Sequence, residues 1–161
     1  MTKGDLSRSP IAIPQRFWHV AYNGDHYPGA PGLMGLEGGA NCQYYAYTIL
    51  RHFGFGIPDF RPSELWADRT FTHVSPAMLP FALVLVHSKP TSFGAHVGLC
   101  LGEGLILHLS RNVGVPAIET LEELQDRDEY RHLIGIKMLS TKTGADFLAQ
   151  APPRHADETV A

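Results

Sequence analysis

The chain has few cysteines and no cluster of basic residues, and both absences narrow its possible functions. Two cysteines, Cys42 and Cys100, occur in 161 residues, whereas a small secreted fold that depends on disulfides usually carries more. Lys and Arg number 13 against 16 Asp and Glu, which gives a formal net charge of −3, and no basic run occurs. Nucleic-acid binding requires clustered cations that neutralise phosphates, so we expect no nucleic-acid partner.

Long apolar runs are also missing. No segment approaches the roughly 20 apolar residues that a membrane-spanning helix needs, so we expect no membrane span. No apolar stretch typical of a secretory signal follows Met1, which predicts a cytoplasmic protein; a secreted or periplasmic location would require a signal that has been removed. The histidines and cysteines lack the close spacing of a zinc site, so we expect no metal and no other cofactor.

The composition that remains is that of one globular domain. Hydrophobic residues make up 44% and charged residues 18% of the chain, and 161 residues are enough to bury one core. Residues 1–16 contain two prolines and no periodicity, which predicts a flexible N-terminal arm. Residues 17–149 form the predicted catalytic domain, and residues 150–161, with two adjacent prolines, predict a disordered tail.

A loop rich in glycine and proline at residues 23–40 leads to the clearest helix of the sequence. Asn41 suits the N-cap, apolar side chains recur every three or four residues over residues 42–53, and Gly54 provides a C-terminal stop. Cys42 would therefore begin a helix, where free N–H groups lower the pKa of a thiol and bind a developing oxyanion. Taken alone, such a cysteine is more often a small core residue.

Strands are predicted after this helix. Apolar segments at residues 81–86, 96–101, 105–109 and 133–139 predict strands with antiparallel connections, and residues 119–130 predict an exposed helix. A helix followed by antiparallel strands predicts an α+β fold, with the N-terminal catalytic helix packed on one face of an antiparallel sheet. By the same patterns, Cys100 is interpreted as a core residue in the middle of a strand.

Two histidines flank a glycine-rich turn between two of these strands. In a hairpin with a three-residue loop, Leu101 pairs with Leu105 and Gly98 faces His108. His96 and His108 then become diagonal neighbours on one face of the sheet, within reach of each other. A two-residue loop would turn the two rings to opposite faces, so the catalytic hypothesis depends on one register.

Residues 41–45 (NCQYY), 96–104 (HVGLCLGEG) and 107–110 (LHLS) closely resemble the NlpC-type papain-like cysteine peptidases. That family carries a cysteine at a helix start, a His-Val-Gly strand that ends in a Gly-x-Gly turn, and a second histidine on the next strand. The resemblance covers about residues 20–140. It implies a papain-like core and cysteine-dependent cleavage of an amide bond. Family members commonly cut the peptide stems of bacterial peptidoglycan, often beside γ-D-glutamyl.

The resemblance also implies roles for single residues. Cys42 is the expected nucleophile, His96 the general base and acid, and His108 the residue that orients His96. The candidates for binding the oxyanion or substrate are Tyr27, Asn41 and Gln43. The loop position favours Tyr27 over Tyr22, although ordinary loop packing explains either tyrosine equally well. The expected partner is a peptide or a small amide substrate.

The chain departs from the family around its cysteine, and other functions stay open. Asn41 stands where the family usually has Asp, and Gln43-Tyr44 stand where it usually has Ser-Gly. The Asn-Cys pair is also similar to relatives of lecithin:retinol acyltransferase, but those have the histidine before the cysteine. An acyltransferase would use the same three residues. A non-catalytic binding protein on this fold is the third possibility, and the intact Cys42, His96 and His108 argue against it.

Overall fold

The computed structural model describes residues 6–140 and 158–160 and has the predicted α+β architecture. Its sheet has six antiparallel strands in the order β1-β6-β2-β3-β4-β5. The strands are β1 (Thr72–Val74), β2 (Leu83–His87), β3 (His96–Gly102), β4 (Leu105–Leu109), β5 (Pro116–Thr120) and β6 (His132–Leu139). The helices are η1 (Gln15–Phe17), α1 (Cys42–His52), α2 (Pro62–Ala67), α3 (Leu121–Gln125) and η2 (Asp128–Tyr130).

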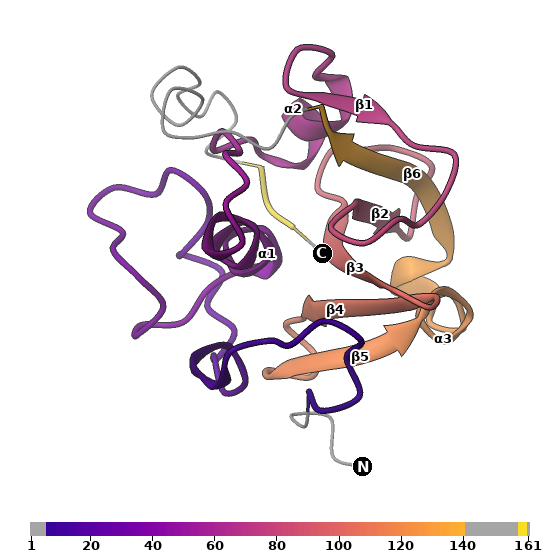
Figure 1. Ribbon diagram of the computed structural model, residues 1–161. Helices are drawn as coiled ribbons and strands as arrows, with labels where there is room; N and C mark the ends of the chain where they lie inside the picture. The colour runs from indigo at the N-terminus through magenta and orange to yellow at the C-terminus, as the bar shows by residue number, and fades with distance from the viewer. Residues whose placement is uncertain (1–5, 141–157, 161) are drawn as a thin grey trace.

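Helices cover both faces of the sheet (Figure 1). One apolar cluster joins α1 to alternate residues of β2, β3 and β4, and the second cluster joins the other set of residues to Leu124 of α3 and Tyr130 of η2. Because side chains alternate along a strand, both faces of the central strands are covered, and every residue of β2 and β4 is buried. This explains why both strands read as unbroken apolar runs. Cys100 is buried in the second cluster, on the face opposite α1.

Helix α1 begins where the sequence predicts. The side chain of Asn41 accepts a hydrogen bond of 2.8 Å from the backbone N–H of Tyr44, so Asn41 is the N-cap and Cys42 the first helical residue. Phe53 is the C-cap, and Gly54 adopts a positive φ of 91° directly after it. The buried face of α1 packs on β3 and β4. Asn41 and Gly54, which lie directly before and just after the helix, therefore determine where α1 begins and ends.

The β3–β4 hairpin has the register that the catalytic hypothesis requires. Leu99 pairs with Leu107 and Cys100 with Ile106, before a bulge at the turn. These pairs have the predicted register, but the predicted pair of Leu101 with Leu105 is wrong: Gly102 pairs with Leu105, and the bulge restores the register beyond the turn. Gly98 is needed here, because a Cβ atom on it would lie 2.6 Å from the Cγ2 atom of Ile106. The hairpin thus brings both histidines onto one face.

The predicted helix over residues 119–130 is confirmed only in part: α3 and η2 lie within this range, but Glu119 and Thr120 belong to a strand. Residues 116–120 form β5, an edge strand that starts at a proline, and the helix α3 begins only at Leu121. Thr120 and Glu123 form a reciprocal capping box, with hydrogen bonds of 3.2 and 3.1 Å, which fixes the start of α3. Glu119 is therefore a strand residue, which matters for the site. The short edge strand β1 was also not predicted.

The ends of the described chain are packed rather than loose. In the predicted arm, Leu6 and Ile13 are buried, and Arg8 donates a hydrogen bond of 3.2 Å to the carbonyl of Ile118. In the predicted tail, residues 158–160 lie against the domain. Residues 1–5, 141–157 and 161, with the remaining parts of the predicted arm, domain and tail, lie outside the described residues. Within the described part, no helix combines the length and apolar character that crossing a membrane would need.

Candidate active site

The sulfur of Cys42 lies at the junction of α1 and β3. Backbone N–H groups of Val97, Gln43 and Cys42 itself lie near it and act to lower the pKa of the thiol. Val97 directly follows His96, so the sulfur lies beside the first residues of β3. The side chain is fully buried, and burial raises the pKa of the thiol to about 11 despite these donors and the nearby Arg61. The thiol is therefore protonated and not ionised as expected, because burial raises its pKa by more than the nearby N–H groups and Arg61 lower it.

His96 and His108 make the contact that the hairpin register predicts. Nε2 of His96 lies 3.0 Å from Nδ1 of His108, and the ring centroids are 5.1 Å apart at an interplanar angle of 85°. Nε2 of His108 lies 2.5 Å from an Oε2 atom of Glu119, and both carboxylate oxygens of Glu119 accept hydrogen bonds from Arg127, at 2.9 and 2.8 Å. His96, His108, Glu119 and Arg127 thus form one chain of hydrogen-bonded side chains, which we call the relay. It runs from the buried His96 to the partly exposed Arg127.

The carboxylate of Glu119 assigns the tautomers of both rings. Its pKa is held far below the usual range, first by the hydrogen bond from His108 and then by Arg127, so it is ionised and can only accept. Nε2 of His108 must therefore carry a proton. When His108 carries no second proton, its Nδ1 accepts a hydrogen bond from Nε2–H of His96. The lone pair of His96 is then on Nδ1. This leaves Nδ1 as the atom of His96 that can take a proton.

His96 is a neutral base in the closed structure. Burial lowers its pKa well below the usual range, and the charges of His108 and Arg127 act in the same direction, while the charge of Glu119 opposes them. The resting pair is therefore a protonated thiol at Cys42 and a neutral imidazole at His96.

Tyr130 packs against the flat face of the His96 ring, whereas His108 contacts its edge. The two rings stack with centroids 4.6 Å apart and an interplanar angle of 25°, and Tyr130 also meets the edge of His108. The phenol hydrogen-bonds to the side chain of Ser110. The sequence placed Tyr130 at the end of a predicted exposed helix and gave no signal for this contact; in the structure Tyr130 lies in η2 and is buried.

Asn41 and Gln43 have structural partners in this arrangement. The side chain of Asn41 caps α1, as described above. The amide nitrogen of Gln43 donates to the hydroxyl of Tyr47 at 2.9 Å and to the carbonyl of Phe60 at 3.0 Å, and the side chain is fully buried. What Gln43 offers to the sulfur is its backbone N–H. The backbone N–H of Asn41 donates to the carbonyl of His26 at 2.9 Å, so of these two residues only Gln43 offers a backbone N–H for an oxyanion.

Tyr22 and Tyr27 line one pocket of about 270 Å³, together with Asn41 and Arg61. The guanidinium of Arg61 lies 4.4 Å from the ring centroid of Tyr27. Burial raises the pKa of Tyr22, and a thiolate at Cys42 would raise it further, which places Tyr22 within electrostatic reach of the sulfur. The structure brings both tyrosines to the site.

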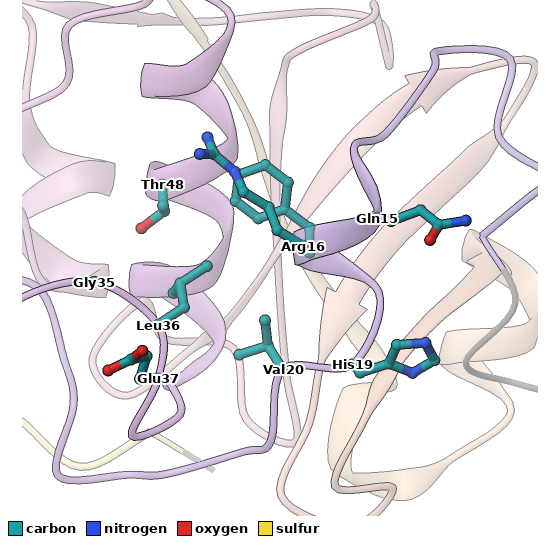
Figure 2. Close-up of a pocket in the computed structure, with 9 residues that line it drawn as sticks. Gln15, Arg16, His19, Val20, Gly35, Leu36, Glu37 and Thr48 are labelled. Carbon is teal, nitrogen blue, oxygen red and sulfur yellow. The ribbon is translucent and has the colours of Figure 1, made fainter.

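A larger cavity of about 570 Å³ lies elsewhere, between η1, the loop at residues 35–37 and Thr48 of α1. Figure 2 shows Val20 and Leu36 between these elements, while Gln15 and His19 extend to the other side of η1. None of the relay residues lines this cavity. It is therefore separate from the candidate site.

The site carries the functional argument, because comparison with known proteins adds nothing to it. No protein-family model and no curated protein matches the chain. Over residues 6–140 and 158–160, no group of three or more His, Cys, Asp or Glu side chains is arranged to hold a metal ion.

The buried neutral His96 predicts a pH-dependent stability. An unfolded histidine gains a proton below a pKa of about 6.5, whereas folded His96, with its lowered pKa, stays neutral. The unfolded state then binds more protons, so the free energy of unfolding falls by up to about 1.4 kcal/mol per pH unit from this residue as the pH drops below 6.5. His96→Gln should reduce the difference in unfolding free energy between pH 7.5 and 5.5 by about 1 kcal/mol, measured by urea denaturation.

The matched control is His19→Gln, because His19 is exposed. This variant should keep the wild-type difference between the two pH values. If His96→Gln also keeps it, the imidazole of His96 is not held neutral by burial.

Proposed function

We propose that the protein is a cysteine-dependent amide hydrolase with a papain-like core of the NlpC type. Cys42 is the nucleophile, His96 the base and acid, and His108 the positioning residue. The observation that carries the proposal is the relay from His96 through His108 to Glu119. The relay begins at His96, and the backbone N–H of the next residue, Val97, lies beside the sulfur of Cys42. This is the arrangement in which a third group orients the base of a nucleophile.

The reaction runs through a thioester. The thiol proton of Cys42 passes to Nδ1 of His96 while the sulfur attacks the substrate carbonyl carbon, and a carbon–sulfur bond forms. The carbonyl oxygen takes the negative charge, and the backbone N–H groups of Cys42 and Gln43, which already face the sulfur, are placed to bind it. The carbon–nitrogen bond then breaks, and the leaving amine takes the proton from His96. Water, activated by His96, hydrolyses the thioester and restores the thiol.

Glu119 contributes through charge rather than contact with substrate. An imidazolium forms on His96 in the first step, and the negative charge of Glu119 favours it. Arg127 keeps that carboxylate ionised and in place through two hydrogen bonds. The relay therefore stabilises the charged intermediate of a base that is neutral at rest.

The proposed substrates are peptides, with peptidoglycan stem peptides or related small peptides as the first candidates. The test is a panel of γ-glutamyl and ordinary peptide amides, incubated with the wild-type protein in ¹⁸O-labelled water and read by mass spectrometry. We expect at least one class to be cleaved, with ¹⁸O in the new carboxylate. Acyl transfer to an added amine without ¹⁸O incorporation would indicate an acyltransferase, and a panel without any product from the folded protein would contradict the proposal.

A further inference from the structure

Residues 158–160 reach the candidate site from the far end of the chain. Glu158 is 1% exposed and Val160 is 4% exposed, although the sequence gives this region no apolar pattern. Figure 1 shows this segment, in yellow, running between α1 and the sheet near β3. The surface that holds it is formed by Arg61, Ser63, Gly94 and Arg111, and we call this surface the 158–160 groove.

The carboxylate of Glu158 is fully engaged in this groove. It accepts hydrogen bonds from the backbone N–H and the hydroxyl of Ser63, at 3.1 and 2.7 Å, and from the backbone N–H of Gly94, at 2.6 Å. Gly94 precedes His96 by two residues, so this contact ties the segment to the base. Gly94 also needs to lack a side chain, because it has a φ of +77° and its Cβ would lie 2.8 Å from the carbonyl oxygen of Thr159.

Two arginines bind the backbone of the same segment. Arg61, which is itself 2% exposed, donates to the carbonyl of Glu158, and Arg111 donates to the carbonyl of Val160 at 3.3 Å. Proteins that bind an extended peptide use hydrogen bonds to its backbone and a site for one of its side chains. Here the arginines bind two backbone carbonyls, and Ser63 and Gly94 bind the acidic side chain. The groove thus has the contacts of a peptide-binding site.

The segment lies beside the residue that precedes the nucleophile. It forms one wall of the 270 Å³ pocket that Asn41 and Tyr22 also line. With the segment in place, Cys42 is 0% exposed and His96 is 1% exposed. A substrate carbonyl cannot reach a sulfur that has no exposed surface.

We propose that residues 158–160 are an internal ligand of the 158–160 groove that closes the site over Cys42, and that the groove binds peptides with an acidic side chain at the position of Glu158. Assigning the groove to substrate rests on the proposed function; the closure itself does not. Release of the segment would hydrate the thiol, and removing burial removes the main reason for the raised pKa of Cys42.

The test is the alkylation rate of the two cysteines in the full chain. Glu158→Ala removes the acceptor of three hydrogen bonds and should speed the labelling of Cys42 by iodoacetamide at pH 8 by about tenfold or more. Labelling of Cys100, which is buried on the other face of the sheet, should stay at its wild-type rate. Peptide mapping reads both sites, and Glu122→Ala, an exposed change on α3, should leave both rates unchanged.

Two further measurements make the result specific. Ser63→Ala removes one donor from the groove side of the same contact and should also speed labelling of Cys42. An acetylated peptide with the sequence of residues 157–161, added at millimolar concentration to Glu158→Ala, should slow it again. The same peptide with Ala in place of Glu should have no such effect.

Unchanged labelling of Cys42 in both Glu158→Ala and Ser63→Ala would overturn the proposal. Equal increases at Cys42 and Cys100 would overturn it too, because they would indicate general loosening. Labelling requires no catalysis, so the two proposals can fail separately. Faster labelling of Cys42 without cleavage of any amide would support the closure and contradict the hydrolase proposal. Equal labelling and equal cleavage rates in wild type and Glu158→Ala would contradict the closure and support the hydrolase proposal.

Discussion

Glu119→Gln is expected to lower kcat for amide cleavage by about 10²- to 10³-fold. This is less than the loss of about 10⁴ seen when the carboxylate that contacts the base of a triad becomes an amide, because Glu119 contacts His108 and not the base itself. A Gln side chain can either accept from or donate to His108, so the relay no longer assigns one tautomer to each ring. The substitution also leaves Glu129 as the acidic partner of Arg127, so the positive charge of Arg127 near His96 is less balanced and disfavours the imidazolium. Both effects act on the charged intermediate, so KM should change little.

Steady-state kinetics with the best substrate of the panel measure this effect. Glu122→Gln is the matched control, because it makes the same chemical change on the exposed surface of α3 and should keep full activity. Thermal melts separate a loss of folding from a loss of catalysis. A Glu119→Gln variant that folds and retains the wild-type kcat would show that Glu119 has no part in orienting the histidines.

The parts of the site that the sequence predicted are those with local signals. Asn41 and Gly54 mark the two ends of α1 by their capping behaviour, and these signals lie within the helix or directly beside it. The contact between His96 and His108 followed from the two-residue period of strands and the length of one turn, both readable over a few residues. A resemblance to a family added the expected roles, and those remain a proposal.

The parts that were missed depend on contacts between distant segments. Glu119 reaches His108 only because β5 pairs with β4, and a helical reading of its surroundings hid that strand. An alternating pattern could have revealed it, since Ala117 and Glu119 share a face. The packing of residues 158–160 has no local signal at all, because polar groups of Ser63, Gly94 and the arginines determine it. The protonated state of Cys42 follows from the burial of its side chain, which is likewise a property of the folded core.

Cys42→Ala is expected to abolish amide cleavage, with a loss of at least about 10⁴-fold, as for removal of a nucleophile from other triads. The chain has one other cysteine, and Cys100 lies buried on the opposite face of the sheet, where it cannot take over. The substitution removes one buried sulfur atom, so the fold should persist, as a thermal melt would show. Cys100→Ala is the matched control, and it should retain activity because Cys100 lies in the middle of β3, on the face opposite α1, and not at the start of α1.

The most direct test of the account locates the acyl group itself. Wild-type protein is mixed with the best substrate of the panel, or with its activated ester, quenched in acid within one turnover, and digested for peptide mapping by mass spectrometry. The account predicts an acyl adduct on the peptide that contains Cys42, and none in Cys42→Ala. An adduct on any other residue, or turnover by Cys42→Ala at the wild-type rate, would contradict the assignment of Cys42 as the nucleophile.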